Sequence, residues 1–237
     1  MELPTSAKFL GIRQRLGRVA RTRKLRAIYR KYRDATMIRE GDFIANLELA
    51  WTAMKDPKLT SGAIVECGTW KGGMSAALIE IGGPGREYHF FDSFEGLPPA
   101  EEIDGARALA WQSDTTSPCY FDNCSASRDE FVATISRTGM LHERVHIHIG
   151  FFDKTLASAN VPGIAVLRLD GDWYDSTMTC LEHLFDKVLP GGIVLIDDYY
   201  AWEGCSRAIH DFLSARSATE QIRTASEQLA FLTKTGD

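Results

Sequence analysis

The chain has 237 residues, of which 44% are hydrophobic and 25% are charged, and its formal net charge is −5. These values are typical of one globular domain with an ordinary core, and they exclude a disordered or fibrous chain. We find no apolar run of the roughly 18 residues that a membrane span needs and no secretory signal. The five cysteines form no CxxC pair. We therefore expect a reducing, cytoplasmic location.

The amino-terminal 33 residues form a basic arm. They carry eleven Lys and Arg against one acid, whereas the rest of the chain holds 16 bases and 31 acids. Apolar residues at helical spacing predict an amphipathic helix here; they are Ile12, Leu16, Val19, Leu25, Ile28, Tyr29 and Tyr32. We favour an arm that packs on an acidic surface, its own or a partner subunit's, over one that binds nucleic acid or anionic lipid. Residues 1–40 are thus expected to be a helical extension of a domain at 41–237.

Short apolar strands and helices alternate along that domain. The expected strands are 63–68, 87–92, 145–150, 164–170, 192–197 and a last one at 228–234. The expected helices are 42–56, 73–83, one opened by a capping box of Ser127 and Glu130, one from about Ser176 with Asp175 as its cap, and one from Cys205. Continuous apolar strands separated by helices predict an α/β fold, a doubly wound, mostly parallel sheet covered on both faces.

Acidic residues stand at the carboxyl ends of four predicted strands. These residues are Glu66, Asp92, Asp170 and Asp197, and Gly150 ends a fifth strand. Ligands of open parallel sheets bind at that edge. Several carboxylates aimed at one place repel each other unless a cation or protons hold them together. The pattern therefore predicts that five strand ends converge on one crevice, in which a cation or protons hold the acids together.

The stretch "VECGTWKGGMS" joins the first of these strands to a helix. Its glycine spacing is not that of dinucleotide binders or of phosphate-binding P-loops. Glu66 could take an ammonium group while helix amides hold a carboxylate, which suits an amino-acid moiety; the alternative is a plain strand–turn–helix connection. Asp92 is placed to accept hydrogen bonds from a ribose, or else to cap the next turn. S-adenosylmethionine has both of these ends.

Four ordered motifs closely resemble those of the macrocin O-methyltransferase family. They are "VECGTWKGGMS", "FDSFEGLP", "LRLDGDWYDST" and "GGIVLIDDY" followed by "AIHDF", within about Thr36 to Phe212. The resemblance implies a class I, Rossmann-like methyltransferase fold. It also implies an oligomeric enzyme that uses S-adenosylmethionine and Mg²⁺ to methylate sugar or phenolic hydroxyls of antibiotics.

The resemblance also implies a role for individual residues. Cofactor contacts are expected from Thr36, Met37, Glu66, Gly68, Gly72, Ser75, Asp92, Ser93, Gly150, Phe151 and Phe152. Magnesium ligands are expected at Asp170, Asp197 and Asp198, and a general base at Asp172. The cation would lower the pKa of an acceptor hydroxyl, and Asp172 would take its proton as the oxygen attacks the sulfonium methyl group.

The acceptor is the least determined part of this hypothesis. We expect a small molecule with a sugar hydroxyl, and a catechol or other phenol is the alternative. Residues 101–124 and 199–206 are expected to shape the acceptor pocket. A nucleic-acid binder acting through the basic arm is disfavoured because it leaves the carboxylates unexplained, and no membrane partner is expected. His146 and His148 are interpreted as structural because they lie inside a strand.

Overall fold

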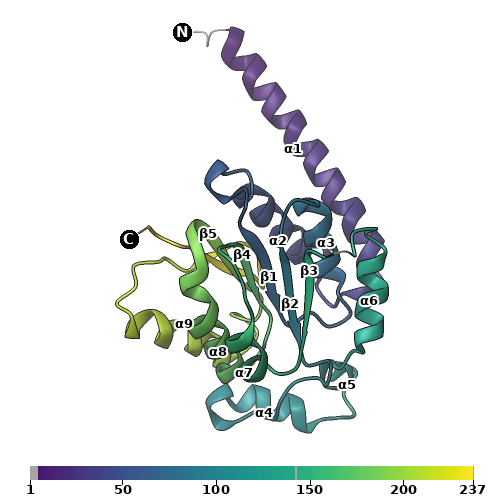
Figure 1. Ribbon diagram of the computed structural model, residues 1–237, viewed down its shortest axis with the longest axis vertical. Coiled ribbons are helices and arrows are strands. Elements are labelled where there is room, and N and C mark those ends of the chain that lie inside the picture. Colours follow the sequence, from purple (N-terminus) through teal and green to yellow (C-terminus); the bar gives the residue numbers. More distant parts are fainter. Residues whose placement is uncertain (1–4, 142, 237) are drawn as a thin grey trace.

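The computed structural model describes residues 5–141 and 143–236, with side chains from residue 17 onward (Figure 1). The helices are α1 Thr5–Tyr32, α2 Glu40–Ala53, α3 Gly73–Gly82, α4 Ala106–Ser113, α5 Phe121–Cys124, α6 Arg128–Ser136, α7 Phe152–Thr155, α8 Tyr174–Leu184 and α9 Glu203–Ala215. The strands are β1 Ala63–Cys67, β2 Tyr88–Asp92, β3 Val145–Ile149, β4 Ile164–Leu169, β5 Val188–Ile196, β6 Arg223–Thr224 and β7 Ala230–Thr233. Single 3₁₀ turns are η1 Arg33–Ala35, η2 Pro57–Leu59, η3 Glu102–Asp104, η4 Leu156–Ser158 and η5 Phe185–Lys187.

The strands of the described residues form one sheet in the order β3-β2-β1-β4-β5-β7-β6. The first five are parallel, and β7 pairs antiparallel with both β5 and β6. The chain starts in the middle of the sheet, moves to one edge and then returns to build the other half. The carboxyl ends of β1 and β4 therefore meet at a switch point, where ligands of such sheets bind. The predicted doubly wound, mostly parallel sheet is confirmed.

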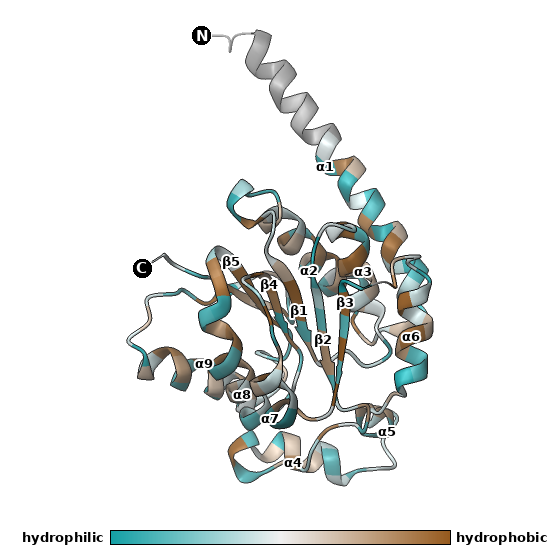
Figure 2. Cartoon of the chain, in the orientation of Figure 1, coloured by the Kyte–Doolittle hydropathy of each residue, from teal (hydrophilic) through white to brown (hydrophobic). Residues whose placement is uncertain are grey.

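Helices cover both faces of the sheet and form two apolar clusters. On one face, residues of α1, α2, α3 and α6 pack on the strands, as Phe43, Leu78 and Phe131 do. On the other, residues of α8 and α9 pack on alternate strand positions, as Leu181 and Phe212 do. Figure 2 shows apolar segments along the strands and mixed surfaces on the helices. Burial on both faces explains why β1 and β4 read as continuous apolar runs.

The basic arm is helical, and its carboxyl-terminal half packs on the body of the protein. Leu25, Ile28 and Tyr32 are buried in the same cluster as α2 and α3. The Tyr32 hydroxyl donates to Glu80 at 2.7 Å, and Lys31 pairs with the same carboxylate. Val19 is exposed, and the side chains of Ile12 and Leu16 lie outside the described residues. This half of the arm thus packs on an acidic residue of its own chain.

The predicted capping box of Ser127 and Glu130 is present at the start of α6. Two other local features differ from expectation. The first is α8, which begins at Tyr174, so that Asp175 lies in its first turn rather than capping it. The backbone N–H of Tyr174 donates to Asp104 Oδ1 at 2.7 Å, so an acid 70 residues earlier satisfies the helix start. The hairpin strand β6 was not expected, because two exposed residues carry no periodic signal.

Three histidines stack across β2 and β3. The His89 ring lies 4.5 Å from that of His146 and 5.4 Å from that of His148, and its Nδ1 is 3.1 Å from His148 Nε2. His146 Nε2 is 2.8 Å from Glu87. Burial, and then the charges of His146 and His148, lower the pKa of His89 to about 4. His89 is therefore neutral in the folded protein at physiological pH, and its role is in packing.

Acidification should destabilise the fold through His89. An unfolded histidine titrates near pH 6.5, so between pH 6.5 and 4 the unfolded chain binds a proton that the folded chain does not. The contribution of neutral His89 to stability is complete above pH 6.5 and falls by about 2 kcal/mol on going to pH 5. Urea unfolding of wild type and His89→Gln at pH 8 and pH 5 measures it, as the change in their difference. The same change in His210→Gln, an exposed position of α9, would contradict burial as the cause.

Among the helices that the structure describes, none combines the length and the hydropathy of a membrane span.

Candidate active site

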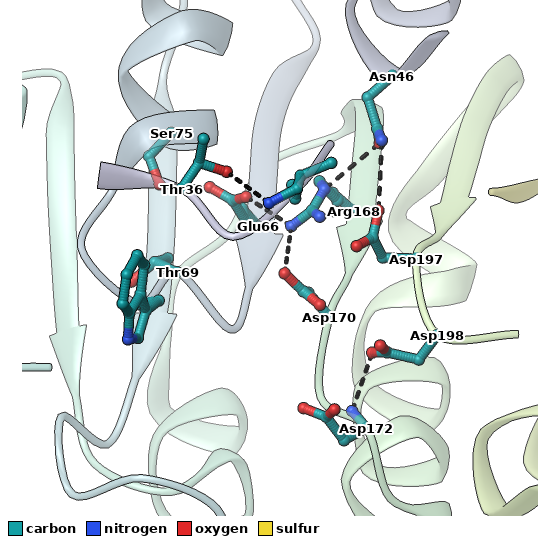
Figure 3. A network of polar contacts seen from close by, with 12 residues as sticks. Thr36, Asn46, Glu66, Thr69, Ser75, Arg168, Asp170, Asp172, Asp197 and Asp198 are labelled. Atoms are coloured by element: carbon teal, nitrogen blue, oxygen red, sulfur yellow. Dashed lines mark hydrogen bonds and ion pairs between the residues drawn. The ribbon is translucent and has the colours of Figure 1, made fainter. Parts of the chain in front are cut away.

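A cavity of about 790 Å³ opens where the carboxyl ends of the five parallel strands meet. Residues that follow each of these strands line it, among them Gly68, Asp92, Phe151, Asp170 and Asp197. Strand ends far apart in the sequence thus converge on one crevice, as predicted from the positions of the acids. Figure 3 shows the polar network on its floor.

Three carboxylates on this floor form a candidate metal site. Asp170 follows β4, and Asp197 and Asp198 follow its neighbour β5. One oxygen from each can be chosen so that all three lie within 4.8 Å of one another. Hard oxygen donors that leave coordination positions open are what Mg²⁺ prefers. The three predicted magnesium ligands are therefore brought together.

A buried arginine links these acids to Glu66 near the end of β1. Arg168 is 1% exposed, and its Nη1 lies 2.8 Å from both Glu66 Oε1 and Asp170 Oδ2. Its Nη2 is 2.9 Å from Asp197 Oδ1, an ion pair without hydrogen-bond geometry. Asn46 of α2 completes the network, because its Nδ2 donates to Asp197 at 3.3 Å and its Oδ1 faces Arg168 Nε at 3.4 Å. One guanidinium therefore orients three carboxylates.

The crevice holds more negative charge than Arg168 balances. Burial raises the pKa of Asp197 to about 6, an effect that Arg168 opposes and the charge of Asp170 reinforces. Burial and the charges of Asp172 and Asp170 raise the pKa of Asp198 well above its usual value. Burial also raises the pKa of Glu66 to about 7, against the pull of Arg168. A divalent cation would relieve this repulsion, so the donor set fits the predicted metal.

Asp172 lies beside this site with an unusual backbone conformation. Its φ is 58°, a left-handed value that a non-glycine residue rarely adopts. Its backbone N–H donates to Asp198 Oδ2 at 3.0 Å, which ties the loop after β4 to the end of β5. Burial and then the charge of Asp170 raise the pKa of Asp172 to about 7. The carboxyl group is thus placed at the cavity wall beside the metal ligands.

The loop after β1 approaches the strand next to it very closely. Gly68 has φ 85°, and a Cβ there would overlap the carbonyl oxygen of Asp170, so only glycine fits. Glu66 is buried and accepts from Arg168 and from the Ser75 hydroxyl. Ser75 is itself buried behind Glu66 and supports it rather than lining the cavity.

Asp92 holds this loop in place. Its Oδ2 accepts the backbone N–H groups of Thr69 at 2.7 Å and Trp70 at 2.9 Å, and its Oδ1 accepts that of Phe94 at 2.8 Å. It therefore caps the following turn and also lines the cavity, and its contact with a ribose stays a prediction. Ser93 closes the same turn by donating to the Gly96 carbonyl and accepting from the Glu95 N–H.

The remaining predicted cofactor residues divide into two groups. Thr36, Met37, Phe151 and Phe152 line the cavity. Gly72 and Gly150 do not; they have φ of 82° and 133° and shape the turns that lead to the wall. The segment that contains Thr36 reaches the site because Ala35 and Thr36 lie against Gly73, at the start of α3.

Sequence reasoning missed Arg168 and Asn46, of which only Arg168 carried a signal, and it expected Trp202 in the acceptor pocket without its contact to Asp172. Arg168 is a charge inside the apolar run "IAVLRLD", and a buried charge requires partners. Asn46 is a polar residue on the buried face of α2, and the sequence analysis did not single it out. Trp202, whose Nε1 donates to Asp172 Oδ1 at 2.7 Å, is 30 residues away in the chain.

Residues 101–124, expected to shape the acceptor pocket, end in a strained turn at α5. All four residues of α5 have φ between 50° and 55°, a left-handed turn. Asn123 anchors it, because its Nδ2 donates to the Leu97 carbonyl at 2.7 Å and its Oδ1 accepts from Gln112 at 3.0 Å. The turn brings Cys124 to the cavity wall.

Solved structures share this architecture. The O-methyltransferase NovP has a TM-score of 0.69 and 26% identity over 81% of each chain. The calicheamicin methyltransferase CalS11, at 20% identity over 83% of this chain and 79% of its own, has a TM-score of 0.63 and supports the fold alone. The fold and its strand-end crevice are those of the Rossmann-like O-methyltransferases.

The macrocin O-methyltransferase (TylF) family profile matches residues 24–234. The chain belongs to that family, which confirms the resemblance of its motifs. A tetracenomycin C rhamnosyl 4'-O-methyltransferase of Streptomyces olivaceus is 37% identical over 68% of this chain, and the demethyldecarbamoylnovobiocin O-methyltransferase of Streptomyces niveus is 31% identical over 69%. The matches span 61% and 62% of those relatives, less than two thirds of their length.

Proposed function

We propose that this chain is an S-adenosylmethionine- and Mg²⁺-dependent O-methyltransferase acting on a sugar hydroxyl of a glycosylated natural product. The carrying observation is that Asp170, Asp197 and Asp198 converge beside Asp172, in a cavity that Asp92 also lines. Two relatives, a rhamnosyl-tetracenomycin 4'-O-methyltransferase and a mycinamicin III 3''-O-methyltransferase of Micromonospora griseorubida, favour a sugar acceptor.

In this proposal the loops after β1 and β2 would hold the cofactor. The bare backbone at Gly68 would admit its amino-acid end, and Glu66 would take its ammonium group. Asp92 and Ser93 face its ribose, and Phe151 and Phe152 border the adenine. Thr36 and Met37 cover it. Asp92 also fixes the loop amides, so cofactor binding depends on it twice.

The residues of the chain then align the acceptor and take its proton. Asp170, Asp197 and Asp198 would hold Mg²⁺, which supplies the Lewis acidity that lowers the pKa of a hydroxyl group. Asp172 accepts the hydroxyl proton from its place at the cavity wall. S-adenosylmethionine supplies an activated methyl group, so alignment and deprotonation are the main tasks left to the protein.

Three further expectations belong to this proposal. The acceptor is a small molecule rather than a nucleic acid. This expectation is supported by α1, because half of this basic helix packs on the body of its own chain. A homo-oligomer stays a prediction. The exposed apolar side chain of Val19 on α1 offers a contact for a second subunit. A reducing, cytoplasmic location is supported by the five free cysteines.

The deciding experiment is a methyl-transfer assay with labelled S-adenosylmethionine and a panel of rhamnosides, other vicinal-diol glycosides and catechol. We expect turnover of a glycoside, its loss in excess EDTA and its recovery with Mg²⁺. Full turnover in EDTA would remove the metal from the mechanism. Turnover of catechol with no glycoside methylated would favour the phenolic alternative, and label in neither class would overturn the proposal.

A further inference from the structure

The indole of Trp202 is hydrogen-bonded to the carboxyl group that the proposed function makes the general base. Trp202 precedes α9, and its Nε1 donates to Asp172 Oδ1 at 2.7 Å. We infer that Trp202 is a positioning residue, which holds the Asp172 carboxylate in the orientation that proton transfer requires. This inference rests on the proposed role of Asp172.

The backbone of Asp172 is fixed independently of this contact. Its N–H donates to Asp198 Oδ2, and its φ of 58° sets the direction in which the side chain leaves the loop. Trp202 then fixes the remaining rotation of the carboxyl group. The hydrogen bonds of the described residues engage only Oδ1, which leaves Oδ2 to meet a hydroxyl proton.

Trp202 is held in turn by its neighbours. Its ring meets Trp173 edge to face at 5.2 Å and Trp111 at 5.7 Å, and the guanidinium of Arg107 lies 5.3 Å from its centre. Arg107 and Trp111 belong to α4, and Trp173 precedes α8. Three side chains from two separate segments therefore restrict the indole and the direction of its N–H.

The chemistry of the indole suits this role. Its N–H is a donor only, so it orients a carboxylate without competing for the proton that the carboxylate must accept. The other two indoles of the cluster donate to backbone carbonyls, Trp111 to Cys119 at 2.8 Å and Trp173 to Pro98 at 2.9 Å. Trp202 alone among these three points at an acid.

The kinetic test compares Trp202→Phe with Trp51→Phe, which replaces an indole of α2 that lies beside Lys24 and Lys55 and does not line the cavity. Trp202→Phe should lower kcat about tenfold, the effect of one well-placed hydrogen bond, with KM for S-adenosylmethionine and half-activation by Mg²⁺ near wild-type values. Trp51→Phe should lose much less. Equal losses in kcat for the two variants would indicate a general effect of losing an indole and would overturn the inference.

A spectroscopic test needs no acceptor. The five tryptophans give five indole N–H signals in ¹⁵N-labelled protein, and Trp202→Phe identifies one of them. That signal should lie downfield and move upfield in Asp172→Asn, because a neutral amide is a weaker acceptor than a carboxylate. It should stay in place in Asp211→Asn, an exposed acid of α9. Its loss on adding Mg²⁺ and S-adenosylhomocysteine would mean that Asp172 turns away when the site is filled, and would overturn the inference.

The two hypotheses fail in different ways. If Asp172→Asn abolishes turnover while Trp202→Phe behaves like Trp51→Phe, the proposed function stands and this inference falls. If Asp172→Asn keeps full turnover, Asp172 is not the base, and both the proposed mechanism and the role of Trp202 are wrong.

Discussion

Replacing Asp172 with asparagine should lower kcat by about 10²- to 10⁴-fold, the range that general acid–base catalysis contributes. Asparagine has the same shape, tolerates the left-handed backbone at this position and keeps an oxygen for the Trp202 indole. Its amide does not take up a proton at neutral pH, so the substitution removes the base and preserves the geometry. Stopped-time assays with labelled S-adenosylmethionine give kcat, and calorimetry gives the affinities for cofactor and Mg²⁺, which should stay near wild-type values.

The matched control for this loss is Asp211→Asn. Asp211 is an exposed acid of α9 that accepts from the Tyr174 hydroxyl at 3.1 Å. Asp211→Asn therefore also removes one negative charge near α8. An equal loss of kcat in the control would indicate a general electrostatic effect rather than proton acceptance. A loss of Mg²⁺ affinity in Asp172→Asn would instead make Asp172 part of the metal site.

Replacing Arg168 with methionine should lower the free energy of unfolding by about 3 to 5 kcal/mol in EDTA, the cost of leaving buried partners of an ion network uncompensated. Arg168 is 1% exposed and contacts Glu66, Asp170 and Asp197. Without it, those carboxylates repel each other in a poorly solvated crevice. Mg²⁺ should restore part of the loss, because the cation takes over some of the neutralisation. Urea denaturation with and without excess Mg²⁺ measures both effects.

An exposed arginine provides the comparison for Arg168. Arg26 pairs with Glu40 at 3.4 Å, and both side chains are about half exposed, so Arg26→Met should change stability by less than about 1 kcal/mol. If Arg168→Met were no more costly than this, the network would not contribute to the fold. If Mg²⁺ recovered nothing, the three aspartates would not be binding the cation.

The strands and most helices could be predicted because each depends on local pattern. The apolar runs at β1, β4 and β5 are long enough to be buried on both faces, and the capping box of Ser127 and Glu130 satisfies its own helix start. The start of α8 could not be found this way, since its N–H group is satisfied by the distant Asp104. The left-handed turn at α5 was also missed, because its conformation is held by contacts of Asn123 with residues 97 and 112.

The candidate site divides in the same manner. Acids at strand ends are visible in the sequence because parallel strands carry their ends to one edge, so Asp92, Asp170, Asp197 and Asp198 could all be placed there. Ser75 was expected in the cavity wall, but it lies behind Glu66, because a helix position alone does not say which side chain stands in front.

The sequence by itself determined the mostly parallel class of the sheet, the edge at which ligands bind and the acids gathered there, since periodicity and the alternation of strands with helices are local patterns. Only the tertiary structure decided how those acids are held: the guanidinium of Arg168 among three carboxylates, and the indole of Trp202 against Asp172. Charge balance and hydrogen-bond direction act across a few ångströms of space. The residues that supply them can lie anywhere in the chain, and no local pattern records which of them will meet.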